Sequence, residues 1–160
     1  MTTRERPAVK VKERALRLLS VRSRSRSELR QRLLRADFEP EEVDAALADL
    51  EAVGLIDDEA FARELAESQK RKGMGRRAGM AALRVKGVDR ELAERIAGDV
   101  NPEDEAERAM EVAAKRLPRL QGLDPVTRQR RLLDFLLRRG YDPATARSAC
   151  FRAMAEEDVA

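Results

Sequence analysis

The stretch GLIDDEAFARELAESQKRKGMGRRAGMAALRVKG, residues 54–87, decides the fold predicted for this chain. Asp57 is the expected N-cap of a helix, with Ile56 before it packing on Phe61. Two glycines end that helix, and a second helix is expected from about Arg76 to Gly87, because apolar side chains recur there at helical spacing. The stretch therefore predicts two helices joined by a basic glycine turn, and similar segments lie on either side of it.

Three segments resemble one another where one helix ends and the next begins. They are RLLRADFEPEEV (residues 32–43), ALRVKGVDRELA (82–93) and FLLRRGYDPATA (135–146). In each, a leucine is followed four residues later by a break residue, which is Asp37, Gly87 or Gly140. An apolar residue and an acidic cap come next, the caps being Glu39, Asp89 and Asp142. Similar junctions at a spacing of about fifty residues are typical of a tandem helical repeat.

The sequence predicts an all-α fold of three tandem three-helix repeats, stacked into an elongated, curved body. The expected repeats are residues 11–55, 56–100 and 101–155, between a flexible N-terminal segment (1–10) and a C-terminal tail (156–160). Each repeat is too small to bury a strong core alone, so we expect neighbouring repeats to contribute to its burial. No alternating apolar pattern is long enough to predict a strand.

The composition excludes several kinds of site. The chain has no histidine, and Cys150 is its only cysteine, so it has no intrachain disulfide, no zinc site built on Cys and His, and no histidine-based triad. We expect no cofactor, no metal and no enzymatic activity, and we expect Cys150 to lie in the core. No apolar run approaches the ~20 residues that span a bilayer, and no signal-type segment is visible, so a cytoplasmic location is expected.

Charge alternates in blocks along the chain. Three blocks are basic: residues 1–35 hold twelve basic and three acidic residues, residues 70–86 hold seven basic and no acidic residues, and residues 115–139 hold eight basic and two acidic residues. Two blocks between them are acidic: residues 37–67 hold one basic and twelve acidic residues, and residues 89–111 hold three basic and nine acidic residues. The second helix of each repeat is therefore basic and the third acidic, although the net charge is only +3. A surface polarised in this way steers a protein toward a charged partner. The alternative is that the blocks pair with one another.

Basic residues near the turns form the predicted binding surface. They are Arg22, Arg24 and Arg26 in the first repeat, Lys70, Arg71, Lys72, Arg76, Arg77, Arg84 and Lys86 in the middle repeat, and Arg138 and Arg139 in the third. A second set is expected to form turns and caps: Ser25, Asp57, Gly73, Gly75, Gly87 and Gly140. Ser25 and Glu28 have the spacing of a capping box. The pair Gly73 and Gly75 follows a helix and lacks the ending of a phosphate-binding loop, so we expect left-handed turn residues there.

Five motifs occur in order over roughly residues 11–155. They are ALRLLSVRSRSRSEL (residues 15–29), GLIDDEAFA (54–62), KGMG (72–75), LRVKGV (83–88) and FLLRRGY (135–141). Together they resemble the RecX family of recombination regulators. One departure is Gly79, where the family more often has a branched aliphatic residue; a glycine inside a helix costs about 1 kcal/mol relative to alanine.

The resemblance implies an all-helical protein of three three-helix repeats. It also implies a non-enzymatic regulator of homologous recombination, acting in DNA repair and the SOS response. Such a regulator binds RecA, lodges in the groove of the RecA–single-stranded DNA filament, and inhibits strand exchange and the RecA ATPase. The implied partners are RecA and its filament, with weak sequence-independent DNA binding in addition, and the chain is expected to act as a monomer without membrane contact.

Two other functions fit the basic helices. One is a direct DNA-binding protein of helix-turn-helix type, because arginine can read guanine, although Asn and Gln are scarce there and no dimerisation segment is apparent. The other is a structural scaffold without a nucleic-acid link. Replacing Lys70, Arg71, Arg76 and Arg77 with alanine would then leave partner binding intact.

Overall fold

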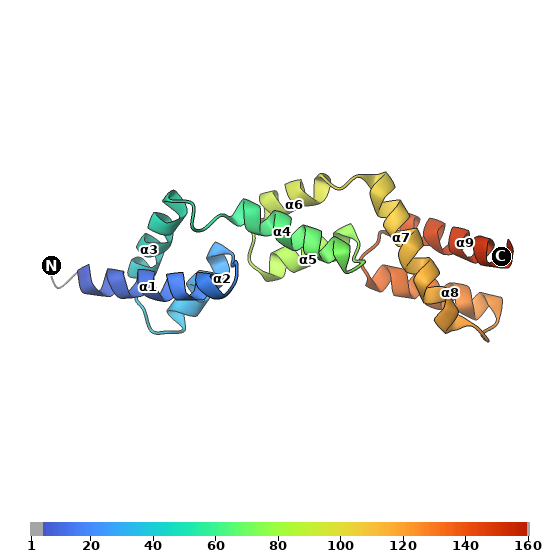
Figure 1. Cartoon of the computed structure of the whole chain (residues 1–160), viewed down its shortest axis with the longest axis horizontal. Helices are drawn as coiled ribbons and strands as arrows, with labels where there is room; N and C mark the ends of the chain where they lie inside the picture. The colour runs from blue at the N-terminus through green and yellow to red at the C-terminus, as the bar shows by residue number, and fades with distance from the viewer. Residues whose placement is uncertain (1–4, 160) are drawn as a thin grey trace. The chain divides into compact units, whose positions relative to one another are not determined.

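The computed structural model describes the backbone of residues 5–159 and the side chains of residues 9–159. Within these residues the chain forms nine α-helices, one short 3-10 helix and no strand (Figure 1). The helices are α1 (Glu5–Val21), α2 (Arg26–Leu34), α3 (Pro40–Ala52), α4 (Asp58–Arg71), α5 (Arg76–Val85), α6 (Arg90–Gly98), α7 (Pro102–Arg116), η1 (Leu117–Leu120), α8 (Pro125–Arg138) and α9 (Pro143–Val159). The all-helical fold predicted from the sequence is confirmed.

Both ends of the helical array differ from the sequence expectation. Helix α1 begins at Glu5, so residues 5–10 are helical rather than a loose segment, while residues 1–4 lie outside the described part. Pro7 is compatible with this start, because it lies in the first turn, where its missing N–H has no helical partner. Helix α9 continues to Val159 through most of the expected tail.

The three sequence junctions adopt one backbone motif. The break residues all have left-handed backbone angles, with φ of 61° at Asp37, 70° at Gly87 and 86° at Gly140. In each case the next residue donates its backbone N–H back to the leucine carbonyl, at 3.4, 3.1 and 3.3 Å respectively. This is the 6→1 bond of a Schellman helix end, and it buries Leu33, Leu83 and Leu136 at the same relative position.

Most of the predicted caps are in place. The carboxylates of Asp57, Asp89 and Asp142 each accept a first-turn N–H, and the Ser25 hydroxyl accepts that of Glu28 at 3.1 Å. Two expectations are wrong. Glu39 makes no side-chain cap bond, because its longer side chain fits this geometry less well than aspartate. The capping box at Ser25 is only half formed, because the Glu28 carboxylate binds arginines instead of reaching back.

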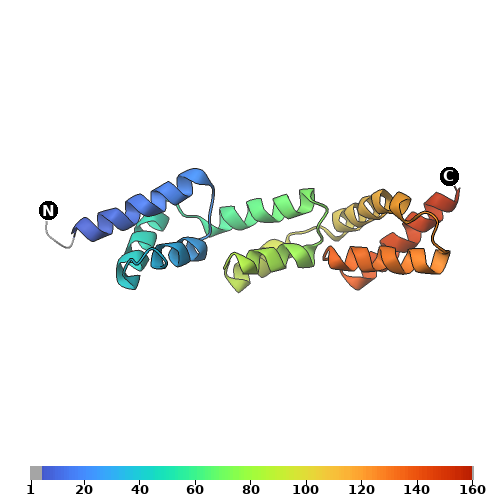
Figure 2. The same ribbon diagram turned by 90° about the horizontal axis from the view of Figure 1, so that it is seen from below.

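The contacts between helices divide the chain into two compact units. Unit 1 comprises Met1–Glu64 and Leu83–Ala93, and unit 2 comprises Leu65–Ala82 and Glu94–Ala160. In unit 1, α1, α2 and α3 pack together around a core of aliphatic side chains (Figure 2). The fully buried members of this core include Val11, Leu29, Leu33, Val43 and Leu47. In unit 2, α7, η1, α8 and α9 enclose a second core that includes Leu132, Leu136, Tyr141 and Cys150.

The division passes through the middle repeat, α4–α6, so one end of this repeat belongs to each unit. In unit 1, the Asp58 carboxylate at the start of α4 accepts the N–H of Arg26, the first residue of α2, at 2.8 Å. The Ser25 hydroxyl donates to the carbonyl oxygen of Lys86, just after α5. Gly87 faces Ser27 so closely that a Cβ there would overlap the serine side chain.

An equivalent junction occurs in unit 2. The buried Glu105 carboxylate of α7 accepts the N–H of Arg76, the first residue of α5, at 2.7 Å. Two further backbone N–H groups donate to carbonyl oxygens just after α8. Gly75 donates to the carbonyl of Arg139 at 2.8 Å, and Arg77 donates to that of Gly140 at 3.0 Å. The two junctions are alike. In each, an acid from the following repeat accepts the N–H of the first residue of the second helix (α2 or α5). The end of the following repeat's second helix (α5 or α8) lies against the turn that precedes that first residue. Such contacts between adjacent repeats are what a tandem repeat requires.

Candidate anion-binding groove

A groove of about 530 Å³ lies within unit 2. It is bounded by the last turn of α4 and Gly73, by one face of α7 with η1, and by the end of α8. The cations that line it are Lys70, Arg71, Lys72, Arg108, Lys115, Arg116, Arg119 and Arg139. Against these eight cations, Glu111 is the one carboxylate among the lining residues.

Helix α7 and the short η1 that follows it together supply half of these cations. Arg108, Lys115, Arg116 and Arg119 are separated by seven, one and three residues. Since residues seven apart share a face of an α-helix, Arg108 and Lys115 project on the same side of α7, and Arg116 and Arg119 line the groove where α7 passes into η1. Lys115 and Arg116 also fall in the last turn of α7, where positive charge is favoured by the helix dipole.

Two hydrogen bonds hold the glycine turn against α8. The Arg139 guanidinium donates to the carbonyl oxygen of Lys72 at 2.6 Å, and the Tyr141 hydroxyl donates to that of Gly73 at 3.0 Å. Tyr141 is fully buried, and burial raises the pKa of its hydroxyl. The wall of the groove formed by residues 70–73 is therefore fixed by contacts with α8.

Phe135 is the aromatic residue of the groove. The guanidinium carbons of Arg116 and Arg139 lie 4.9 and 5.0 Å from the centre of its ring, within cation–π range. The ring therefore orients two arginines of the groove.

Little negative charge from the protein neutralises this groove. Among residues 9–159, Lys70 is the one groove cation that forms an ion pair, with Glu67 at 2.6 Å. The Nε atoms of Arg108 and Arg116 are buried and have no hydrogen-bond acceptor in this part of the chain. The protein therefore leaves these two arginine donors unsatisfied, whereas guanidinium groups form their strongest hydrogen bonds with anionic acceptors.

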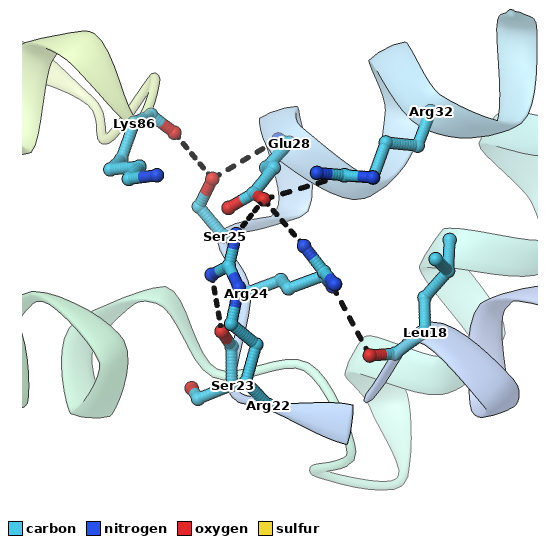
Figure 3. A network of polar contacts seen from close by, with 8 residues as sticks. All are labelled: Leu18, Arg22, Ser23, Arg24, Ser25, Glu28, Arg32 and Lys86. Atoms are coloured by element: carbon cyan, nitrogen blue, oxygen red, sulfur yellow. Dashed lines mark hydrogen bonds and ion pairs between the residues drawn. The ribbon is translucent and has the colours of Figure 1, made fainter. Parts of the chain in front are cut away.

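The cations of the first repeat have a different environment. Arg24 is buried, donating to the Leu18 carbonyl at 3.1 Å and to Glu28 at 2.6 Å (Figure 3). The same Glu28 carboxylate also binds Arg22 and, at 3.5 Å, Arg32. Burial acts to raise the pKa of Glu28, but the hydrogen bonds from Arg22 and Arg24 outweigh it and the pKa is lowered. The placement of Arg24 on a binding surface is wrong, because this arginine joins α1 to α2.

Oppositely charged blocks of the first repeat do pair with each other. Arg30 forms a two-bond pair with Asp44 at 2.7 and 3.1 Å, and Arg26 lies 3.3 Å from Glu51. In this repeat the alternative interpretation of the charge pattern therefore holds, since basic α2 faces acidic α3.

The other predicted cations lie outside the groove. Arg76, Arg77 and Arg84 are exposed on α5. Lys86 and Arg138 line two smaller hollows of about 180 and 330 Å³ in units 1 and 2. The structure thus gathers only Lys70, Arg71, Lys72 and Arg139 of the predicted set. The groove residues missed from the sequence are Arg108, Lys115, Arg116 and Arg119, and their signal was the spacing of Arg108 and Lys115 on one face of α7 with two further arginines just beyond.

Two other kinds of site can be assessed for the described residues. Among residues 9–159, no group of three or more His, Cys, Asp or Glu side chains is arranged to hold a metal ion. No helix in the described part of the chain is long and apolar enough to cross a membrane.

The fold and the groove define a tandem helical-repeat protein with a cationic, ligand-sized surface groove. Comparison with known proteins identifies the family. Models of the first, second and third three-helix domains of RecX match residues 12–50, 57–95 and 103–150. The chain belongs to the RecX family.

Relatives agree with this assignment, and a solved structure agrees with the fold. The regulatory protein RecX of Amycolatopsis mediterranei (strain U-32) is 44% identical over 138 residues, which cover 86% of this chain and 79% of the relative. That of Streptomyces coelicolor is 35% identical over 152 residues, covering 94% and 81%. The crystal structure of RecX from Lactobacillus salivarius has a TM-score of 0.83 over 98% of this chain and 99% of that one; at 20% identity it supports the fold alone.

Proposed function

We propose that this protein is a non-enzymatic regulator of homologous recombination that binds RecA and the RecA–single-stranded DNA filament and inhibits its ATPase and strand-exchange activities. The observation that carries the proposal is the match of all three repeats, in order, to the three RecX domains. The partner is the one implied by the RecX resemblance. We place this action in the cytoplasm and assign it to a monomer.

The groove gives this proposal a physical basis. A nucleoprotein filament carries the phosphates of its DNA and presents a large, charged surface. A cluster of eight cations with one internal ion pair attracts such a surface and accelerates the encounter with it. Regulation by contact needs no nucleophile or base.

The direct test is ATP hydrolysis by RecA on single-stranded DNA with increasing amounts of the purified chain. We expect hydrolysis to fall and filaments to disassemble once the chain saturates its sites. Unchanged hydrolysis and unchanged disassembly, at concentrations where the chain is bound, would overturn the proposal. A clear preference for one duplex sequence would instead favour the helix-turn-helix alternative.

A variant tests the role of the basic turn. Replacing Lys70, Arg71, Arg76 and Arg77 with alanine should weaken binding to the filament while preserving helicity, because exposed charges contribute little to stability. The matched control removes four exposed cations of the first repeat, namely Lys10, Arg14 and Arg17 of α1 and Arg35 just after α2. Equal weakening by both variants would show that net charge, and not the turn, governs binding.

A further inference from the structure

We propose that the basic groove of unit 2 is a binding site for linked phosphate groups, as in the backbone of single-stranded nucleic acid, and that the α7–η1 face carrying Arg108, Lys115, Arg116 and Arg119 is its main wall. This inference deepens the proposed function, because it assigns a groove to the nucleic-acid component of the filament. It concerns binding in the absence of RecA, so it can be tested separately.

The first argument is the excess of unpaired charge. Eight cations surround a space of about 530 Å³ with a single carboxylate, Glu111. In the described residues only one of these cations, Lys70, is held in an ion pair, in contrast to the paired cations of the first repeat. Clustered like charges repel one another, so the groove gains stability when an anion with several charges occupies it.

The second argument is the arrangement of the cations. Arg108 and Lys115 lie seven residues apart on one face of α7, which advances about 5.4 Å per turn, and Arg119 follows them in η1. Residues 70–72 also line the groove. A chain of phosphates can therefore be contacted at several successive groups, whereas one isolated anion would meet only part of the groove.

The third argument concerns the chemistry of the donors. Five of the eight cations are arginines, and their planar guanidinium groups match phosphate oxygens with two parallel hydrogen bonds. The buried Nε atoms of Arg108 and Arg116 have no acceptor among the described residues.

The lining favours a nucleic acid over an acidic protein segment. Protein interfaces are built around buried apolar or aromatic anchors. Here the large apolar side chains are Val112 and Phe135, and two guanidinium groups lie near the Phe135 ring. Few apolar surfaces are left for a peptide, whereas the backbone of a nucleic acid needs none.

The test measures binding of fluorescein-labelled oligothymidine to the full chain without RecA, by fluorescence anisotropy over a range of salt concentrations. The variant is Lys115→Ala/Arg119→Ala, because both side chains are exposed and neither makes an ion pair in the described structure. We expect its affinity to fall about tenfold and its salt slope to decrease by about 1.4, since each lost phosphate contact removes about 0.7 for a single strand. The matched control, Arg147→Ala/Arg152→Ala, removes two exposed cations of α9 outside the groove and should change neither value appreciably.

Competitors identify the chemistry and the source of the phosphates. Inorganic tripolyphosphate should displace the oligothymidine more effectively than oligoglutamate of equal charge. Groove-dependent binding of oligothymidine supports a nucleic-acid backbone; groove-dependent binding of tripolyphosphate alone supports a free polyphosphate. Equal losses in the groove and control variants, or equal competition by oligoglutamate, would overturn the proposal.

The RecA assay separates the two proposals. If the groove variant loses oligothymidine binding while the wild-type chain inhibits RecA, both proposals stand. If the wild-type chain fails to inhibit RecA but binds oligothymidine through the groove, only the proposed function fails. If inhibition is seen and no groove-dependent binding of phosphates occurs, only the groove assignment fails.

Discussion

Two glycines four residues apart give a sharp test of the junction between the middle and third repeats. Gly75 immediately precedes α5, and Gly79 lies inside it. A Cβ added at Gly75 would lie 2.6 Å from the backbone carbon and oxygen of Gly140 and from the Tyr141 nitrogen. A Cβ at Gly79 would meet nothing within 4 Å. The same substitution, glycine to alanine, should therefore have opposite effects at the two positions.

The magnitudes follow from the contacts. At Gly75, alanine would disturb the hydrogen bonds that Gly75 and Arg77 donate to Arg139 and Gly140, and each such bond contributes about 1 kcal/mol. Overpacking against rigid backbone adds about 1–3 kcal/mol, so Gly75→Ala should lower the free energy of unfolding by roughly 3–5 kcal/mol. Gly75 has no left-handed backbone angle, contrary to the sequence expectation, so lack of space and not strain causes this loss. Gly79→Ala should raise stability by about 1 kcal/mol through helix propensity.

The assay is urea denaturation followed by circular dichroism at the helical minimum, with both variants fitted against the wild-type chain. The reasoning is refuted if Gly75→Ala costs less than about 1 kcal/mol, a third of the lowest estimate. It is also refuted if Gly79→Ala destabilises the protein, because a hidden contact at that position would then exist.

Three carboxylates give further predictions. Glu105→Ala should lower the free energy of unfolding by about 1–3 kcal/mol and accelerate hydrogen exchange of the Arg76 amide, because that N–H loses a buried acceptor; Glu105→Gln should recover part of the loss. Burial raises the pKa of Asp58 above 3.8, so the contribution of the protonated carboxyl to stability is present below that pH and is lost as pH rises through the folded-state pKa. Over that rise, urea titrations should show the free energy of unfolding of Asp58→Asn increasing relative to that of wild type. The pKa of Glu28 is lowered below 4.5, so the excess in free energy of unfolding of wild type over Glu28→Gln should be complete above that pH and shrink with acidification. An excess that did not change with pH would contradict the stabilisation of the Glu28 carboxylate by its arginines.

The helical repeat could be predicted because local chemistry sets it. Leu33, Leu83 and Leu136 precede break residues that adopt the same left-handed conformation, and this pattern is visible in the sequence. Such helix ends can be predicted from the local sequence, because both hydrogen bonds of a Schellman motif form within six consecutive residues.

The candidate site was only partly predictable, because it depends on contacts between segments far apart in the sequence. Arg24 is held by nearby residues, Leu18 and Glu28, whereas the role of Arg71 in the groove depends on residues of α7 and of the α8 end. Lys115 and Arg119 lie in a basic block of the sequence, but their importance depends on their lining the same groove as the turn at residues 70–73. The cross-repeat cap by Glu105 likewise could not be deduced, since its partner Arg76 is 29 residues away.

The source of the helix caps has a consequence for synthesis of the chain. Helix α5 begins after a glycine without a side-chain cap, and Glu105 of the following repeat supplies the acceptor. Helix α8, by contrast, is capped by its own Asp124 at 3.0 Å. A ribosome produces α5 before the residue that completes its cap, so the start of α5 should emerge as a loosely ordered nascent segment. The start of α5 would reach its final structure only when α7 and α8 have left the exit tunnel. Residues of the third repeat therefore complete the second repeat.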